Sequence, residues 1–304
     1  MAITVVGSVA LDSIRTPRGE VEDILGGTAL HFSNSASLLS SINLIAVVGN
    51  DFPKEGFDFF YAKNVDVEGL QIVTDGRTFR WKGYYEKDMS RAITIDTQLN
   101  VFESFQPKVP AKYLGSDFLF LGNIDPDLQY EVLKQINHKK AAILDTMNFW
   151  ISSKREQLNK VIKNVEVIVL NDQELRDLTG ENNIIKAGKQ LLDMGPLYVV
   201  VKKGEHGASI FGKDGEYFSL PAFPIEELFD PTGAGDSFAG GLVSYLDKKG
   251  KLNFDNLKKA VCYATIISSF NVEHFGIKGI EKITHKDVKD RYKTFSRFVS
   301  LPEI

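Results

Sequence analysis

A turn of small residues that ends in an acid, Gly233-Ala234-Gly235-Asp236, has the residue types and the spacing for chemistry on an anion. Glycine lets backbone N–H groups approach a ligand closely, and the first N–H groups of a helix lack partners within that helix. The pattern therefore predicts a loop that runs into a helix and binds an anion where the helix begins. No lysine follows the glycines, so the Walker A pattern is absent.

Asp236 falls in the first turn of that predicted helix. A carboxylate beside an anion hole suits phosphoryl transfer to an alcohol. The amides of Gly233, Ala234 and Gly235 would hold the charge on the phosphoryl oxygens while the carboxylate accepts the hydroxyl proton. An acid in a first turn also stabilises any helix by about 0.3–1 kcal/mol through the helix dipole. Spacing alone leaves both interpretations open.

Composition limits the class of protein. The chain has 304 residues, 43% hydrophobic and 25% charged, which is typical of a soluble globular protein with a substantial core. Its net charge is −4 with no basic cluster, so we expect no nucleic-acid partner. Cys262 is the only cysteine, which suits a reducing cytoplasmic location. We expect no signal peptide and no membrane association, because no apolar run approaches the ~18 residues of a membrane span.

Strand-like runs alternate with helical patterns along most of the chain. The alternation is regular from residue 111 on, and three helices are expected after the small-residue turn, over roughly 234–248, 254–270 and 284–298. This order predicts an α/β fold with a doubly wound, mostly parallel sheet flanked by helices. Because no linker or repeat interrupts residues 1–304, we predict a single domain.

Two segments, approximately 13–25 and 69–100, break this alternation. Leu70–Val73, residues 78–85 and residues 92–95 alternate roughly between polar and apolar or aromatic side chains, as half-exposed antiparallel strands do. We interpret the two segments as a small β lid inserted in the core. Its aromatic face would cover a substrate, pair with another subunit or close an edge of the core, and its exposed strand edges suit a homodimer.

Polar residues and a glycine follow successive predicted strands, and the carboxyl ends of parallel strands meet in one crevice. The residues are Asp12, Asn123, Asp145, Asn171 with Glu174, and Gly204. Asp12 is alternatively a simple turn residue. Gly26 and Gly27 open a helical pattern in which ligand hydroxyls could approach the backbone, and His31 lies in its first turns as either a ligand contact or a packing residue.

Asn171 and Glu174 are three residues apart at a predicted helix start, so they face the same way. An amide and a carboxylate can hold the waters around Mg²⁺, which uses few protein ligands. Asn at an N-cap with Glu at the third helical position is also an ordinary capping box. The sequence favours neither interpretation.

Three motifs together resemble the ribokinase-like (PfkB) carbohydrate and nucleoside kinase family. Asp230-Pro231-Thr232-Gly233-Ala234-Gly235-Asp236 is similar to the C-terminal signature of the family. Gly26-Gly27 with the following helix and Val48-Gly49-Asn50-Asp51 is similar to the N-terminal signature. Asn171-Asp172-Gln173-Glu174 matches its Asn-x-x-Glu motif. The motifs occur in the family's order and span the chain from Gly7 to about Phe275.

The resemblance implies ATP-dependent phosphorylation of a hydroxymethyl group, with Mg²⁺ and, in several members, a monovalent cation such as K⁺ near Asp230. It makes Asp236 the general base and the amides of Gly233, Ala234 and Gly235 the anion hole. It places the substrate at Asp12, Gly26, Gly27 and the position of His31. ATP would lie along Asn171, Lys202, Gly204, Gly207 and Thr232, and Glu174 with Asn171 would lie near Mg²⁺ and bind it through water. The family usually has Asn where this chain has His31, which leaves the acceptor open.

We therefore predict a small-molecule kinase that phosphorylates a sugar hydroxyl, with a nucleoside kinase as the alternative. Aromatic residues such as Trp81 and Tyr85 would suit a nucleobase, but they would equally pack a lid or stack on a sugar. A non-catalytic nucleotide or metabolite sensor is a further alternative, against which the intact Asp236 argues. A dinucleotide-dependent dehydrogenase is disfavoured, because Gly7 opens no Gly-x-Gly-x-x-Gly fingerprint.

Overall fold

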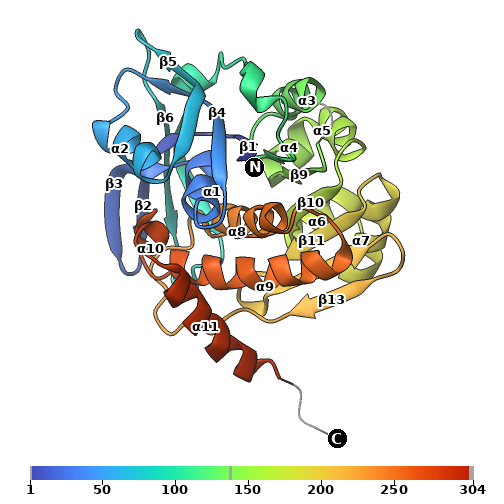
Figure 1. The fold of residues 1–304 in the computed structure, drawn as a ribbon. Coiled ribbons are helices and arrows are strands. Elements are labelled where there is room, and N and C mark those ends of the chain that lie inside the picture. The colour runs from blue at the N-terminus through green and yellow to red at the C-terminus, as the bar shows by residue number, and fades with distance from the viewer. Residues whose placement is uncertain (1, 137–138, 301–304) are drawn as a thin grey trace, which may run out of the picture.

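A computed structural model describes residues 2–136 and 139–300. Its centre is a nine-stranded sheet in the order β13-β12-β11-β10-β9-β8-β1-β4-β5 (Figure 1). Neighbouring strands from β5 to β11 run parallel, and β12 and β13 form an antiparallel edge. The strands are β1 Ala2–Val6, β4 Ser41–Gly49, β5 Val65–Val73, β8 Phe118–Leu121, β9 Ala141–Asp145, β10 Val167–Asn171, β11 Tyr198–Lys202, β12 Ala208–Gly212 and β13 Tyr217–Leu220.

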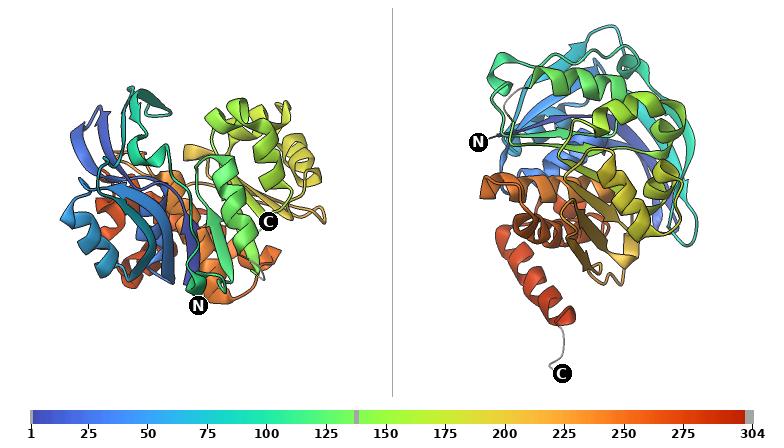
Figure 2. Two further views of the ribbon diagram at one scale, coloured as in Figure 1. Left: turned by 90° about the horizontal axis from the view of Figure 1, so that it is seen from above. Right: turned by 90° about the vertical axis from the view of Figure 1, so that its right-hand side faces the viewer.

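Helices cover both faces of this sheet, as Figures 1 and 2 show. The helices are α1 Thr28–Ala36, α2 Lys54–Ala62, α3 Pro126–Gln135, α4 Asn148–Ser153, α5 Arg155–Ile162, α6 Asp172–Thr179, α7 Ile184–Asp193, α8 Ala234–Lys249, α9 Phe254–Asn271, α10 Lys278–Glu281 and α11 His285–Phe298. Short 3₁₀ turns lie at η1 Asn100–Phe102, η2 Ala111–Tyr113 and η3 Gly204–His206. The predicted α/β class with a doubly wound, mostly parallel sheet is confirmed.

Alternation along the buried strands divides the interior into two main apolar clusters. In β4, Leu44 and Ala46 join the cluster beneath α1, α8 and α9, whereas Ile45 and Val47 join the cluster beneath α3, α5, α6 and α7. Successive side chains of a strand point to opposite faces, so a strand covered on both sides must be apolar throughout. This explains why β4 is a nearly continuous run of aliphatic residues.

A second, four-stranded sheet, here called the small sheet, has the order β3-β2-β6-β7. It consists of β2 Ala10–Thr16, β3 Gly19–Gly26, β6 Phe79–Tyr85 and β7 Ala92–Gln98. These strands include the predicted excursion over 13–25. The expectation that Leu70–Val73 also belongs to the small sheet is wrong, because β5 pairs in parallel with β4. As the edge strand of the large sheet, β5 is only partly covered, which produces the same half-exposed pattern.

The three predicted C-terminal helices are present as α8, α9 and α11. The helix expected over 153–163 is present as α5, and a further short helix that was not expected, α4, ends just before it at Ser153. In Figures 1 and 2, α11 extends away from the body toward the C-terminal end. Within the described ranges, no helix has the length and apolar character needed to cross a bilayer.

Candidate active site

The N-terminal ends of α1 and α8 lie together because the two helices pack side by side (Figure 1). Gly240 permits this contact, since a Cβ there would lie 2.0 Å from Ser35 Oγ and 2.4 Å from the carbonyl oxygen of Phe32. α1 begins after Gly27, with φ 90°, and α8 begins after Gly233, with φ 72°. Glycine adopts both positive φ values without a steric cost. Two turns that precede helices are thus brought face to face.

The turn before α8 is fixed by two buried side chains. Asp230 accepts hydrogen bonds from the N–H groups of Thr232 (2.9 Å) and Gly276 (3.0 Å). Asn271, the last residue of α9, donates to the carbonyl of Thr232 (2.8 Å) and accepts from the Ser237 hydroxyl (2.9 Å). These hydrogen bonds tie the turn to residues 271–276 and fix the backbone where it enters α8. Within this turn the Ala234 N–H donates to the Pro231 carbonyl at 3.2 Å, so the anion hole at Gly233, Ala234 and Gly235 stays a prediction.

Asp236 lies in the first turn of α8, as the sequence predicts. Burial and, to a smaller extent, the nearby charge of Asp145 raise the pKa of its carboxyl group, which lies at about 7. The ammonium of Lys202 and a hydrogen bond from the Thr28 side chain act in the opposite direction. A carboxyl group that titrates near neutral pH can accept a proton from an alcohol in the transition state and release it afterwards.

Lys202 ends β11 and lies beside the start of α8. Its Nζ donates to Asp145 Oδ1 across 3.3 Å, and the two side chains are 19% and 6% exposed. A Cβ on Gly235 would lie 2.9 Å from this Nζ, so the absence of a side chain there makes room for the ammonium. Burial alone lowers the pKa of Lys202, but Asp145, Glu174 and Asp236 raise it above its ordinary value. The site therefore contains a permanent cation.

Asp12 faces the turn before α1. It is 5% exposed, and the Gly27 N–H donates to its Oδ2 at 3.4 Å. A Cβ on Gly26 would lie 1.9 Å from the same oxygen. Gly26 therefore leaves space for the Asp12 carboxylate, a role the sequence did not suggest. The pKa of Asp12 is raised to about 7, mainly by burial and also by the charges of Asp230 and Asp236, while the hydrogen bond from the Gly27 N–H acts in the opposite direction.

His31 lies behind the anion-hole turn. It is 2% exposed, and its ring would lie 2.3–2.5 Å from a Cβ on Gly233. Burial lowers its pKa to about 4, so the imidazole is neutral at pH 7, and both ring nitrogens are buried with no hydrogen-bond partner among the described residues. Of the two roles considered, this position favours packing, and a contact between His31 and substrate stays a prediction.

Asn171 and Glu174 form a capping box at the start of α6. The Glu174 N–H donates to Asn171 Oδ1, and the Asn171 N–H donates to Glu174 Oε2, each at 2.7 Å. Burial raises the pKa of Glu174 to about 7, although Lys202 lowers it. The capping interpretation is thus present in the structure, and the carboxyl group still lies close enough to Lys202 for their charges to interact.

The two glycines expected along a nucleotide differ in their surroundings. A Cβ on Gly204 (φ 54°) would meet nothing within 4 Å, so this part of η3 is open. A Cβ on Gly207 (φ 86°) would lie 2.0 Å from the carbonyl oxygen of Leu220, so packing between β12 and β13 alone accounts for that glycine. Thr232 contacts the small sheet, because its hydroxyl lies 3.1 Å from that of Tyr85.

Sequence reasoning assigned no role to Thr28 or Asn271, and it noted Asp145 only as a residue that follows a strand. For Asp145, the sequence signal that could have indicated a role in the site was its position at the end of a buried strand. No sequence pattern marked Thr28 or Asn271, because their positions in the site depend on how α1, α8 and α9 pack.

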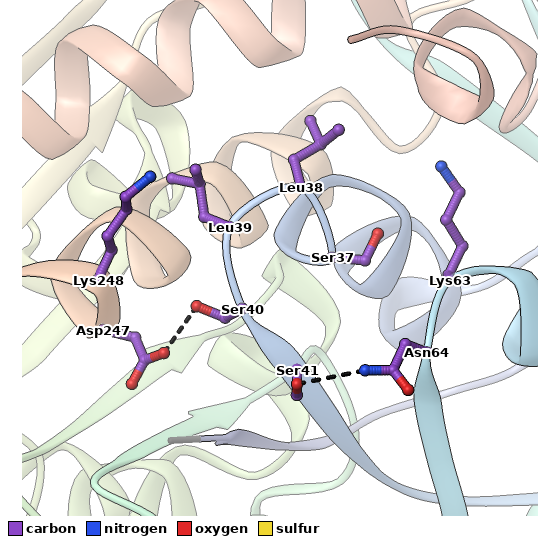
Figure 3. Close-up of a pocket in the computed structure, with 9 residues that line it drawn as sticks. All are labelled: Ser37, Leu38, Leu39, Ser40, Ser41, Lys63, Asn64, Asp247 and Lys248. Carbon is purple, nitrogen blue, oxygen red and sulfur yellow. Dashed lines mark hydrogen bonds between the residues drawn. The ribbon is translucent and has the colours of Figure 1, made fainter. Parts of the chain in front are cut away.

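A separate pocket of about 460 Å³ lies at the opposite ends of α1 and α8 (Figure 3). Ser40 donates there to Asp247, and Lys63 and Lys248 flank the opening. None of the residues predicted for the site line this pocket. This pocket is therefore separate from the candidate site.

Comparison with known proteins identifies the class that this fold and site define. The pfkB family carbohydrate kinase domain matches residues 2–282. The chain therefore belongs to the pfkB family of carbohydrate kinases, a class of phosphotransferases that act on hydroxyl groups. The resemblance found in the sequence is confirmed.

Two curated relatives match most of the chain. It is 29% identical to a cytidine kinase of Thermococcus kodakarensis over 80% of this chain and 87% of the relative. It is 26% identical to an inositol 3-kinase of Arabidopsis thaliana over 95% of this chain and 78% of the relative. The relatives thus include kinases named for a nucleoside and for a cyclic polyol.

Solved structures share the fold. A protein described as a ribokinase II of E. coli, in complex with ATP and Mg²⁺, has a TM-score of 0.81 at 18% identity, covering 96% of this chain and 99% of that chain. The aminoimidazole riboside kinase of Salmonella enterica, in complex with its riboside and an ATP analogue, has a TM-score of 0.76 at 17% identity, covering 96% and 100%. At these identities the likeness concerns the fold alone.

Proposed function

We propose that this protein transfers the γ-phosphoryl group of ATP to a sugar hydroxyl of a nucleoside. The observation that carries the proposal is the position of Asp236. Its carboxylate stands in the first turn of α8, directly after the glycine turn, with Lys202 on one side and Asp12 near enough for their charges to interact. We therefore assign Asp236 as the base, the glycine turn as the anion hole and Lys202 as the buried cation of a site where an alcohol and a phosphoryl group would meet.

The same residues would carry the phosphoryl transfer. The acceptor hydroxyl gives its proton to Asp236 while its oxygen forms a bond to the γ-phosphorus. The bond from that phosphorus to the bridging oxygen breaks, and ADP leaves with the electron pair. Backbone amides of Gly233, Ala234 and Gly235 stabilise the charge on the three equatorial oxygens, as expected for a transition state that requires positioning and electrostatics.

Mg²⁺ fits this site as an ion held mainly by phosphate and water. Across residues 2–136 and 139–300, no group of three or more His, Cys, Asp or Glu side chains could hold a metal. One oxygen of Glu174 is engaged in the capping box, and Asn171 shares that box. Mg²⁺ commonly retains several waters and takes few protein ligands. Glu174 and Asn171 would therefore hold it through water, and the ion would neutralise phosphate charge.

The cytidine kinase favours a nucleoside as the acceptor. Its match with this chain covers 87% of its length. The carboxylate of Asp12 beside Gly27 offers an acceptor for a ribose hydroxyl. The inositol 3-kinase, which matches 95% of this chain, makes a cyclic polyol the second candidate.

The test is ADP release with ATP and Mg²⁺ against cytidine, other nucleosides, ribose, hexoses, sugar phosphates and inositol. We expect strong turnover with a nucleoside and loss of most turnover in Asp236→Asn, with ATP binding retained. Asp247→Asn, at the far end of α8, is the matched control and should remain active. Turnover with inositol alone would select the second candidate. Turnover by Asp236→Asn close to that of the native chain would remove the assigned base.

A further inference from the structure

We propose that Asp145 is a positioning residue, and that it holds the Lys202 ammonium at the anion hole as the catalytic cation for the transferred phosphoryl group. The inference rests on the proposed function and goes beyond it by giving a role to Asp145. Lys202 would exchange its contact with Asp145 for the phosphoryl oxygens as their charge develops.

The sheet sets the distance between these two residues. Asp145 ends β9 and Lys202 ends β11, and β10 lies between these strands. Asn171, the last residue of β10, pairs with Lys202, so the lysine side chain reaches over the end of β10 toward Asp145. The carbonyl of Asp145 is held in turn by Gln129 Nε2 at 3.0 Å. The carboxylate is therefore carried on a fixed backbone.

The ammonium is aimed at the start of α8. Its Nζ occupies the space that a side chain on Gly235 would take, beside the amides of the predicted anion hole. An ammonium has three N–H donors. Within the described ranges Lys202 uses one of them, on Asp145 Oδ1 at 3.3 Å. Donors thus remain for phosphoryl oxygens on the side of Gly235.

Charge balance explains why both residues are needed. A buried ammonium without a partner is costly, so Asp145 keeps Lys202 protonated and in place before the nucleotide binds. The triphosphate then brings more negative charge than one carboxylate. The same carboxylate also repels Asp236, whereas Lys202 attracts it, so the two residues move the pKa of the base in opposite directions.

The experiment compares Lys202→Met, Asp145→Asn and the double variant, in the full chain. For Lys202→Met we expect kcat to fall by about 10²–10³-fold, the loss typical of one group that stabilises transferred charge, and binding of a non-hydrolysable ATP analogue to weaken. For Asp145→Asn we expect kcat to fall by about 10- to 100-fold through misplacement of the ammonium, with analogue binding unchanged or tighter. The double variant should be no slower than Lys202→Met, because Asp145 acts through Lys202.

The pH profile distinguishes positioning from a purely structural ion pair. Asp145→Asn should move the acidic limb of kcat/KM to lower pH, Lys202→Met should move it to higher pH, and the double variant should return it toward the native position. If Lys202→Met fails to fold, the double variant, which does not leave the Asp145 carboxylate without its partner, is compared with Asp145→Asn instead.

Two results would overturn the inference: equal kcat in Asp145→Asn and the native chain, or additive losses in the double variant. Both leave the proposed function standing when Asp236→Asn is inactive. If the native chain released no ADP with any acceptor of the panel, that result would instead count against the proposed function.

Discussion

The hydroxyl of Tyr85, on β6 of the small sheet, lies 3.1 Å from the hydroxyl of Thr232, in the turn before α8. The two residues are separated by 147 positions in the sequence. A second contact joins the same two parts of the fold, because Arg18, at the turn between β2 and β3, pairs with Glu227 at 2.7 Å. The Arg18–Glu227 pair is half-exposed and contributes little. Of these two contacts, the Tyr85–Thr232 pair is the one that reaches the turn before α8 itself.

Tyr85→Phe should raise the KM for the acceptor by about 2- to 10-fold, which corresponds to the net free energy of one hydrogen bond. The small sheet would close less firmly over the site while the apolar part of the ring remains. Steady-state kinetics at saturating ATP measure the effect. Tyr84→Phe is the control, because that ring packs under Arg15 and not on Thr232. Equal effects of the two substitutions would show that the Tyr85 hydroxyl has no special role.

The pKa of Asp236 predicts how activity depends on pH. The base must be ionised to accept a proton, and its pKa is raised to about 7, so kcat/KM should rise with pH through about 7 and then level off. The pKa of Asp12 is raised to about 7 as well, so the rise of kcat/KM with pH reports the joint titration of Asp12 and Asp236. Activity that stays constant from pH 5 to pH 8 would contradict this assignment.

The same shift has a consequence for stability. A carboxyl group whose pKa rises on folding contributes stability that is complete below the unfolded pKa of about 3.9 and is lost as pH rises through the folded value near 7. Asp236→Asn should therefore increase the free energy of unfolding by about 1–3 kcal/mol at pH 8 and by less at pH 5. Urea denaturation at the two pH values measures this. A gain that is equal at both would show that the carboxyl group is not strained by burial.

The sequence predicted the local structure around the candidate site residues correctly. Asp236 is in the first turn of a helix after a glycine turn, and Asn171 caps a helix with Glu174, because both features depend on neighbours within a few positions. Continuous aliphatic runs such as β4 also predicted the parallel sheet. These signals are properties of short segments and need no knowledge of the fold.

Contacts between distant segments were not predictable. The pair Gly26-Gly27 suggested close approach of a ligand, but Gly26 makes room for Asp12 of a different strand. Leu70–Val73 had the alternation of a small-sheet strand, yet it lies on the edge of the large sheet. In both cases the sequence pattern is present, but the residue or strand that it contacts is decided by packing with another segment of the chain.

Gly26→Ala tests the space that this glycine provides. A methyl group 1.9 Å from Asp12 Oδ2 must displace the carboxylate, so the KM for the acceptor should rise by more than tenfold while the KM for ATP changes little. Gly115→Ala is the matched control, since a Cβ there would meet nothing within 4 Å and its φ is not positive. A small change in acceptor KM for Gly26→Ala would mean that Asp12 does not bind the acceptor.

His31→Asn would restore the residue that the family usually has, and it separates the two roles of this position. The smaller side chain would leave a gap behind Gly233, so we expect the free energy of unfolding to fall by about 1–3 kcal/mol and kcat to fall, with little change in acceptor KM. His285→Asn, exposed on α11, is the control for the chemical change itself. Kinetics and urea denaturation give the three quantities. A higher acceptor KM with unchanged stability would instead show that His31 contacts the substrate, because a supporting ring cannot be removed without loosening the turn it supports.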